Sequence, residues 1–217
     1  MSKNTRLINS VIAAAVILFV VIVDQITKKL VVDNMSLGES IVVIKGVLQI
    51  TYITNSGSAF GMLSNARWVF MILSVVGISA VAAYTFWQAD KMSRTMIVLL
   101  SLISGGGIGN MIDRLFNGET FGAGVVIDFV DFIGFGELWK WIYNFADACV
   151  TVSCGLLIVV LIAGEIRRAR LLKKNGQIKA GETELPEAGA SEQTGTHDAG
   201  ASADCDNKDE KQNRDDT

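Results

Sequence analysis

The sequence predicts an all-α membrane protein in which four transmembrane helices carry a small extracytoplasmic β segment and an interfacial loop. Half of the 217 residues are hydrophobic, the mean hydropathy is +0.41 and there is a single proline. This composition is too apolar for an ordinary soluble domain. A membrane-spanning helix needs about 20 predominantly apolar residues. Four stretches meet that requirement, at residues 7–30, 68–87, 95–116 and 144–164.

The first stretch resembles a cleavable signal peptide, because Lys3 and Arg6 precede an apolar run. A cleavage site of small residues should follow such a run. Instead, Asp24 and two lysines follow it. We therefore expect this stretch to be retained as the first span.

Basic residues predict the orientation of the four spans, since they are enriched in short cytoplasmic segments. One predicted side holds nine of them: Lys3, Arg6, Lys91, Arg94, Arg167, Arg168, Arg170, Lys173 and Lys174. We therefore expect a multi-pass protein with both termini in the cytoplasm. All four tryptophans fall at span ends, as is typical of residues at the membrane interface.

Two segments then face outward. Residues 31–66 contain a β-branched run, Ile41–Thr54, that is interrupted at Lys45 and Gly46 and predicts a hairpin or small sheet. Residues 117–143 predict a short strand around Asp128 and an interfacial loop.

We interpret residues 1–174 as one membrane domain and residues 175–217 as a tail. The tail has 11 acidic and 4 basic residues and lacks aromatic residues. Such a segment cannot bury enough apolar surface to offset its chain entropy. We expect a disordered acidic cytoplasmic tail.

Polar residues within or beside the spans all fall at the predicted outer ends, and charges within spans suggest function. These residues are Asp24, Lys28, Asn110, Asp113, Arg114, Asp128, Asp131, Asn144 and Asp147. The glycine-rich run at 104–109 follows no strand, so we expect it to allow close helix packing rather than to bind phosphate.

Each of these signals also has a purely structural interpretation. Asp24 and Lys28 could form an ion pair within one helix, and the polar face of the third span could bond helices together. Asn144 could cap the fourth helix, with an acid in the first turn. The two loop acids could be solvated.

The side-chain inventory narrows the possible chemistry. The one histidine, His197, lies in the tail, so no Ser-His or Cys-His pair and no histidine zinc site is expected in the membrane. The three cysteines suggest small packing residues. Carboxylates remain, and two of them held close together share a proton and can activate water for hydrolysis. We expect neither a metal nor a cofactor.

Five motifs carry a family resemblance. They are Asp24-Gln-Ile-Thr-Lys28, Asn55-Ser-Gly-Ser-Ala-Phe60, Gly106-Gly-Ile-Gly-Asn-Met-Ile-Asp-Arg114, Val126-Ile-Asp-Phe129 and Asn144-Phe-Ala-Asp147. In this order, with four spans, they resemble the lipoprotein signal peptidase (signal peptidase II) family over residues 7–165. The sequence departs from the pattern at Ser58, where alanine is common, and in the acidic tail.

The resemblance implies the roles of the site residues. Asp128 and Asp147 match the catalytic aspartates, and Asp131 is a minor rival outside the pair. The positions implied to bind substrate or support the site are Asp24, Lys28, Asn55, Asn110, Asp113, Arg114 and Asn144.

The resemblance also implies an aspartic endopeptidase of the bacterial cytoplasmic membrane. Its substrate would be a diacylglyceryl-modified prolipoprotein, cut before the lipid-bearing cysteine at the outer face. We expect contact with membrane lipid, no nucleic-acid partner and a monomer. A small proton- or ion-coupled transporter is the alternative, and it predicts acids near the bilayer midplane and an inverted repeat.

Overall fold

The computed structural model describes residues 3–56, 67–138 and 141–183. Its long helices are α1 (Lys3–Asn34), α2 (Arg67–Trp87), α3 (Arg94–Phe116) and α4 (Phe145–Thr183). Its strands are β1 (Ser40–Ile44), β2 (Leu48–Asn55), β3 (Val126–Phe132) and β4 (Ile142–Tyr143), and a 3₁₀ helix, η3, covers Ile133–Leu138. The chain forms two compact units, Met1–Arg170 and Leu171–Thr217, and the first contains all of these strands.

The four helices are each long and apolar enough to cross a membrane, which confirms the prediction from hydropathy. Large apolar side chains such as Leu18, Leu73 and Leu156 are exposed along them, as expected for surfaces that face lipid. The fourth span was predicted at residues 144–164, and the helix that contains it, α4, continues to Thr183. Leucine, alanine, lysine and arginine after residue 164 are strong helix formers, so the helix crosses the predicted tail boundary.

The glycine-rich run makes α3 the central helix of the first unit. A β-carbon on Gly105 would lie 2.8 Å from Val20 Cβ in α1. One on Gly106 would lie 2.6 Å from the Ala146 carbonyl oxygen in α4, and one on Gly107 would lie 2.6 Å from Ile78 in α2. Successive residues of a helix point about 100° apart. The three glycines therefore let three different helices approach α3, as the predicted packing role requires.

The strands form a four-stranded antiparallel sheet in the order β1-β2-β3-β4. β1 and β2 are the predicted hairpin, with Gly46 at φ 74° in its turn. β3 is the strand predicted around Asp128, and η3 occupies part of the predicted interfacial loop. β4 was not predicted, because two residues are too few to show a pattern.

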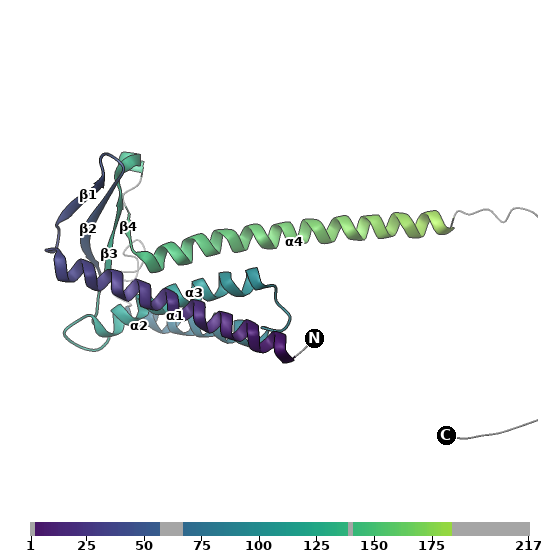
Figure 1. Ribbon diagram of the computed structural model, residues 1–217, viewed down its shortest axis with the longest axis horizontal. Coiled ribbons are helices and arrows are strands. Elements are labelled where there is room, and N and C mark those ends of the chain that lie inside the picture. The colour runs from purple at the N-terminus through teal and green to yellow at the C-terminus, as the bar shows by residue number, and fades with distance from the viewer. Residues whose placement is uncertain (1–2, 57–66, 139–140, 184–217) are drawn as a thin grey trace, which may run out of the picture. The chain divides into compact units, whose positions relative to one another are not determined.

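The sheet packs at one end of the helices (Figure 1). Val31, near the C-terminal end of α1, is buried with Ile127 and Phe129 of β3. This small core fixes β3 over the end of α1. The same strand brings Asp128 next to the beginning of α4.

Candidate active site

Asp128 lies in the middle of β3 and is 1% exposed. Its carboxyl group accepts a hydrogen bond from Asn144 Nδ2 at 2.7 Å on Oδ1. Its other oxygen accepts one from Asn55 Nδ2, at the end of β2, at 3.0 Å. Two side-chain amides therefore orient this carboxyl group from opposite sides.

Asp147 lies in the first turn of α4. Its Oδ1 accepts a hydrogen bond from Asn110 Nδ2 of α3 at 2.7 Å. The Asn144 backbone N–H donates to Asp147 Oδ2 at 3.3 Å, and the Asp147 N–H donates to Asn144 Oδ1 at 2.9 Å. This reciprocal pair is a capping box, so the structural interpretation of these two residues is confirmed.

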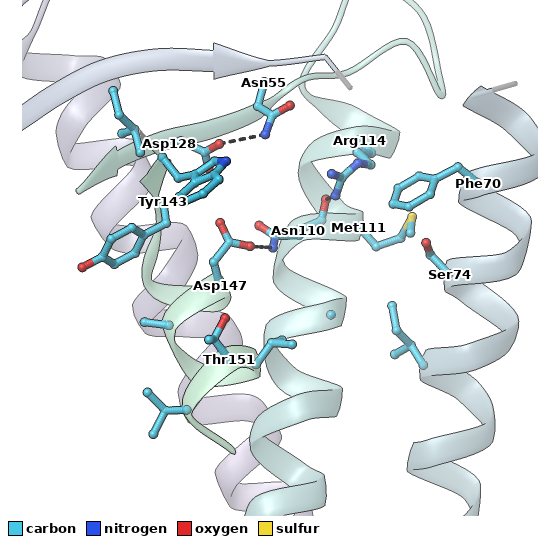
Figure 2. Close-up of a pocket in the computed structure, with 17 residues that line it drawn as sticks. Asn55, Phe70, Ser74, Asn110, Met111, Arg114, Asp128, Tyr143, Asp147 and Thr151 are labelled. Carbon is cyan, nitrogen blue, oxygen red and sulfur yellow. Dashed lines mark hydrogen bonds between the residues drawn. The ribbon is translucent and has the colours of Figure 1, made fainter. Parts of the chain in front are cut away.

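Asn144 also joins the two acids. It is fully buried, its backbone N–H bonds Asp147 and its side-chain amide bonds Asp128. The same amide donates to Asn110 Oδ1 at 3.0 Å. Figure 2 shows the carboxyl groups of Asp128 and Asp147 on the same side of a pocket, with Asn110 beside Asp147.

Burial raises the pKa of Asp128 from 3.8 to about 6. The negative charge of Asp147 contributes to this rise, whereas the hydrogen bonds from Asn55 and Asn144 reduce it. Removal from water disfavours the ionised form of a carboxyl group, and so does a like charge nearby. Asp128 is therefore suited to carry a proton.

A charged network lies beneath the two acids. The Lys28 ammonium group is 2% exposed and lies 2.7 Å from Asp24 Oδ2, 2.8 Å from Asp113 Oδ2 and 3.0 Å from Asn110 Oδ1. The predicted ion pair within α1 is thus confirmed. It extends to α3, as the predicted hydrogen bonding between spans requires.

Arg114 lines the pocket from α3. Its guanidinium carbon lies 5.2 Å from the centre of the Phe70 ring, within the range of a cation–π contact. Figure 2 shows Arg114 and Phe70 across the pocket from Asp147. A fixed cation facing two carboxyl groups can bind a developing negative charge or a carbonyl oxygen.

The pocket has a volume of about 710 Å³ and two kinds of wall. Asn55, Asn110, Arg114 and the two acids form its polar part. The remaining lining residues are mostly apolar and come from α2, α3, α4, β4 and the residue before β4: Phe70, Ser74, Ile78, Gly107, Met111, Trp141, Ile142, Tyr143, Ala148, Val150, Thr151 and Val152. The acids thus face a space that suits a largely apolar ligand.

Asp131 is placed apart from this site. It lies three residues after Asp128 on β3, and side chains at odd spacings point to opposite faces of a strand. Its carboxyl group accepts hydrogen bonds from Gln49 Nε2 at 2.6 Å and Thr51 Oγ1 at 3.0 Å. Asp131 does not line the pocket.

Two further residues near the site were not predicted. Gln25 donates to Asp113 Oδ1 at 3.0 Å and to the Gly109 carbonyl at 3.2 Å. A polar residue beside Asp24 in an apolar span was a usable signal for it. Phe70 gave no signal, because an aromatic residue in an apolar span is ordinary.

Other expectations concern residues or groups outside this arrangement. Residues 57–60 of the Asn55 motif, Ser58 among them, lie outside the described residues, as does His197. Among the residues that the structure describes, no three His, Cys, Asp or Glu side chains are grouped so as to hold a metal ion. Cys149 and Cys154 are free and partly buried.

Comparison with known proteins identifies relatives over most of the chain. The family model described as signal peptidase (SPase) II matches residues 16–163. A lipoprotein signal peptidase of Leifsonia xyli is 39% identical over 71% of this chain and 68% of its own length. One from Halalkalibacterium halodurans is 39% identical over 71% of this chain and 94% of its own length.

Solved structures show the same similarity. A bacterial membrane enzyme determined by the in meso method is 33% identical and has a TM-score of 0.59, over 70% of this chain and 87% of that one. A second such structure is 34% identical with a TM-score of 0.58, over 69% of this chain and 91% of that one. The family resemblance seen in the motifs is confirmed.

Proposed function

This chain belongs to the signal peptidase II family and removes signal peptides from prolipoproteins, and we propose that Asp128 and Asp147 catalyse the cleavage as an aspartic dyad. The observation that carries the proposal is the Asn144 residue shared by the two acids. Because one buried residue bonds both carboxyl groups, they are held together beside the pocket. That is the arrangement which hydrolysis by two carboxyl groups requires.

The two acids take different roles in this mechanism. Asp147, which accepts N–H bonds from Asn110 and from the Asn144 backbone, is the base that removes a proton from water. The water oxygen attacks the peptide carbonyl carbon, while protonated Asp128 donates a hydrogen bond to the developing oxyanion. Proton transfer to the departing amine then completes the cleavage without a covalent intermediate. Arg114 stabilises negative charge on the substrate.

The pocket supports the implied substrate. A diacylglyceryl-modified cysteine and the apolar signal segment before it would occupy the apolar part between α2, α3 and α4. The bond before that cysteine would then lie at the polar end, at the dyad. Cleavage would take place at the outer face of the cytoplasmic membrane, with the sheet outside and both termini in the cytoplasm.

The transporter alternative is not supported. Its acids should lie midway along the helices, whereas here they lie at helix ends and in a strand. The relatives described above are peptidases by name.

The dyad is tested by Asp128→Asn and Asp147→Asn, which keep the size of each side chain and remove its ability to ionise. Each is expected to reduce cleavage of a diacylated prolipoprotein by on the order of a thousandfold or more, since the two acids share one step. The measurement is single-turnover cleavage by purified enzyme. A thermal melt of each variant checks that it is folded.

Asp131→Asn is the matched control, because this acid lies on the same strand but outside the pocket. It should retain most of the activity. Normal cleavage by either dyad variant would overturn the proposed mechanism, and so would a loss that follows only from unfolding.

A further inference from the structure

Lys28 is a fully enclosed cation with three acceptors. Its ammonium group has three N–H donors, and these match Asp24 Oδ2, Asp113 Oδ2 and Asn110 Oδ1 at 2.7, 2.8 and 3.0 Å. The Lys28 side chain does not line the pocket.

Two of the acceptors bond the backbone next to a member of the dyad. Asp24 Oδ1 accepts the Ala146 backbone N–H at 3.0 Å, one residue before Asp147. Asp113 Oδ2 accepts the Ile127 backbone N–H at 3.3 Å, one residue before Asp128.

The third acceptor reaches Asp147 through its side chain. Asn110 Oδ1 accepts hydrogen bonds from Lys28 and from Asn144 Nδ2. Both bonds require that the oxygen of this amide face them, so its NH₂ group must face Asp147, where it donates at 2.7 Å. Lys28 thereby fixes which end of the Asn110 amide meets the base.

We propose that Lys28 is a positioning residue, whose three bonds hold the strand that carries Asp128 and the helix that carries Asp147 at the spacing that catalysis requires. This inference rests on the proposed dyad. On this proposal, a residue of the first span positions the carboxyl groups of Asp128 in β3 and Asp147 in α4.

A merely stabilising ion pair would have a different effect. Replacing it would lower the melting temperature and leave each folded molecule fully active. A positioning residue, when replaced, lowers kcat in molecules that remain folded. It leaves KM nearly unchanged, because the pocket lining is intact.

The experiment uses Lys28→Arg in the full-length protein, measured with a diacylated prolipoprotein. Arginine keeps the positive charge between Asp24 and Asp113. Its planar guanidinium group cannot donate to all three acceptors that surround the Lys28 ammonium nitrogen. We expect kcat to fall at least tenfold and KM to change by less than about threefold. We also expect the pH profile of kcat to change, because the amide that Asn110 directs at the dyad is no longer held in place.

In the described part of the chain, the positive groups around the dyad are Lys28 and Arg114, with Arg67 near Arg114, and the negative groups are Asp24 and Asp113. The variant keeps all their charges, so a change in the pH profile reports geometry. The second variant, Lys28→Met with Asp113→Asn, also leaves the total charge unchanged. It retains an oxygen acceptor for the Ile127 N–H, and the same loss of kcat is expected.

The matched control is Lys29→Arg. Lys29 is the next residue of α1, is exposed, and forms its own ion pair four residues along, 3.0 Å from Asp33 Oδ2. It should leave kcat and the pH profile unchanged.

Wild-type kcat and pH profile in either folded Lys28 variant would overturn the positioning role. Failure of both variants to fold would also overturn it, because Lys28 would then serve stability alone. Failure of the dyad itself is recognised separately, since Asp128→Asn and Asp147→Asn would then cleave normally.

Discussion

Asn144 shows how a residue that begins a helix can also build a catalytic site. Its backbone N–H and side-chain oxygen form the capping box with Asp147, a local arrangement typical of helix N-termini. The unused NH₂ group of the same side chain points to Asp128. Capping and catalysis are therefore not competing interpretations of this residue, because each uses different atoms.

The raised pKa of Asp128 lowers the free energy of unfolding at neutral pH, where the buried carboxyl group must ionise. Burial raises its pKa from 3.8 to about 6, so the folded chain binds this proton more tightly than the unfolded chain. The contribution to stability is fully present below about pH 4 and is lost as the pH rises through 6. At about 1.4 kcal/mol per unit of pKa, the loss amounts to about 3 kcal/mol.

We therefore expect the melting temperature of the wild-type protein in detergent to fall between about pH 4.5 and 7.5 by more than that of Asp128→Asn. The asparagine cannot ionise, so this part of the pH dependence disappears, while acids that do not interact with Asp128 contribute equally to both proteins. Parallel melting curves across the whole range would contradict the raised pKa.

At the scale of elements, the dyad depends on how closely α3 and α4 approach. Gly106 of α3 faces the Ala146 carbonyl at the beginning of α4, one turn from the Asn110 that bonds Asp147. Backbone cannot move aside as a flexible side chain can. Because Gly106 has no side chain, α3 and α4 lie close enough for Asn110 to bond Asp147.

Gly106→Ala should separate the two helices at the site. Its β-carbon would lie 2.6 Å from a backbone oxygen and 2.8 Å from Val150 Cγ2, so α4 must shift and the Asn110–Asp147 hydrogen bond must lengthen. We expect kcat to fall at least tenfold, since small displacements of catalytic groups have effects of this size. Helical content by circular dichroism should be unchanged.

Gly155→Ala, further along α4, is the control, because a β-carbon there meets nothing within 4 Å. It should retain activity and gain slightly in stability, as alanine is the better helix former. Full activity in Gly106→Ala would show that the approach of the two helices does not limit catalysis.

Sequence patterns predicted those features that depend on local composition. Apolar length predicted the helices, and β-branched residues around Lys45 and Gly46 predicted the hairpin. The family resemblance of the motifs implied that Asp128 and Asp147 form the catalytic pair, which stays a prediction. The rotation of each helix about its axis leaves no such signal, so the three different partners of Gly105, Gly106 and Gly107 could not be predicted. For the same reason, the sequence did not predict that Asn144 both caps α4 and bonds Asp128.

In the whole molecule, the predicted site residues lie within the part of the chain that matches the family model, residues 16–163. Every predicted site residue lies in the unit Met1–Arg170, and the family match ends at residue 163. The continuation of α4 to Thr183 extends past both. The described residues that line the pocket all lie before residue 153.

Ending the chain after Lys174 should leave membrane insertion intact and cleavage within about twofold of the full-length rate, because the sequence predicts neither a span nor a site residue in the removed part. Membrane fractionation and cleavage per mole of purified enzyme are the measurements. A large loss of activity at normal membrane levels would assign the tail a function of its own.

The ion pair between Lys28 and Asp24 lies within one helix, and this has a consequence for the order in which the protein is made. The first span leaves the ribosome before Asp113 and Asn110 of the third span exist. An unpaired charge within a span costs roughly 3 kcal/mol or more during insertion. Because its counter-charge stands four residues earlier on the same helix, Lys28 can enter lipid already neutralised. The third span then adds the partners that turn this early pair into the support for both acids.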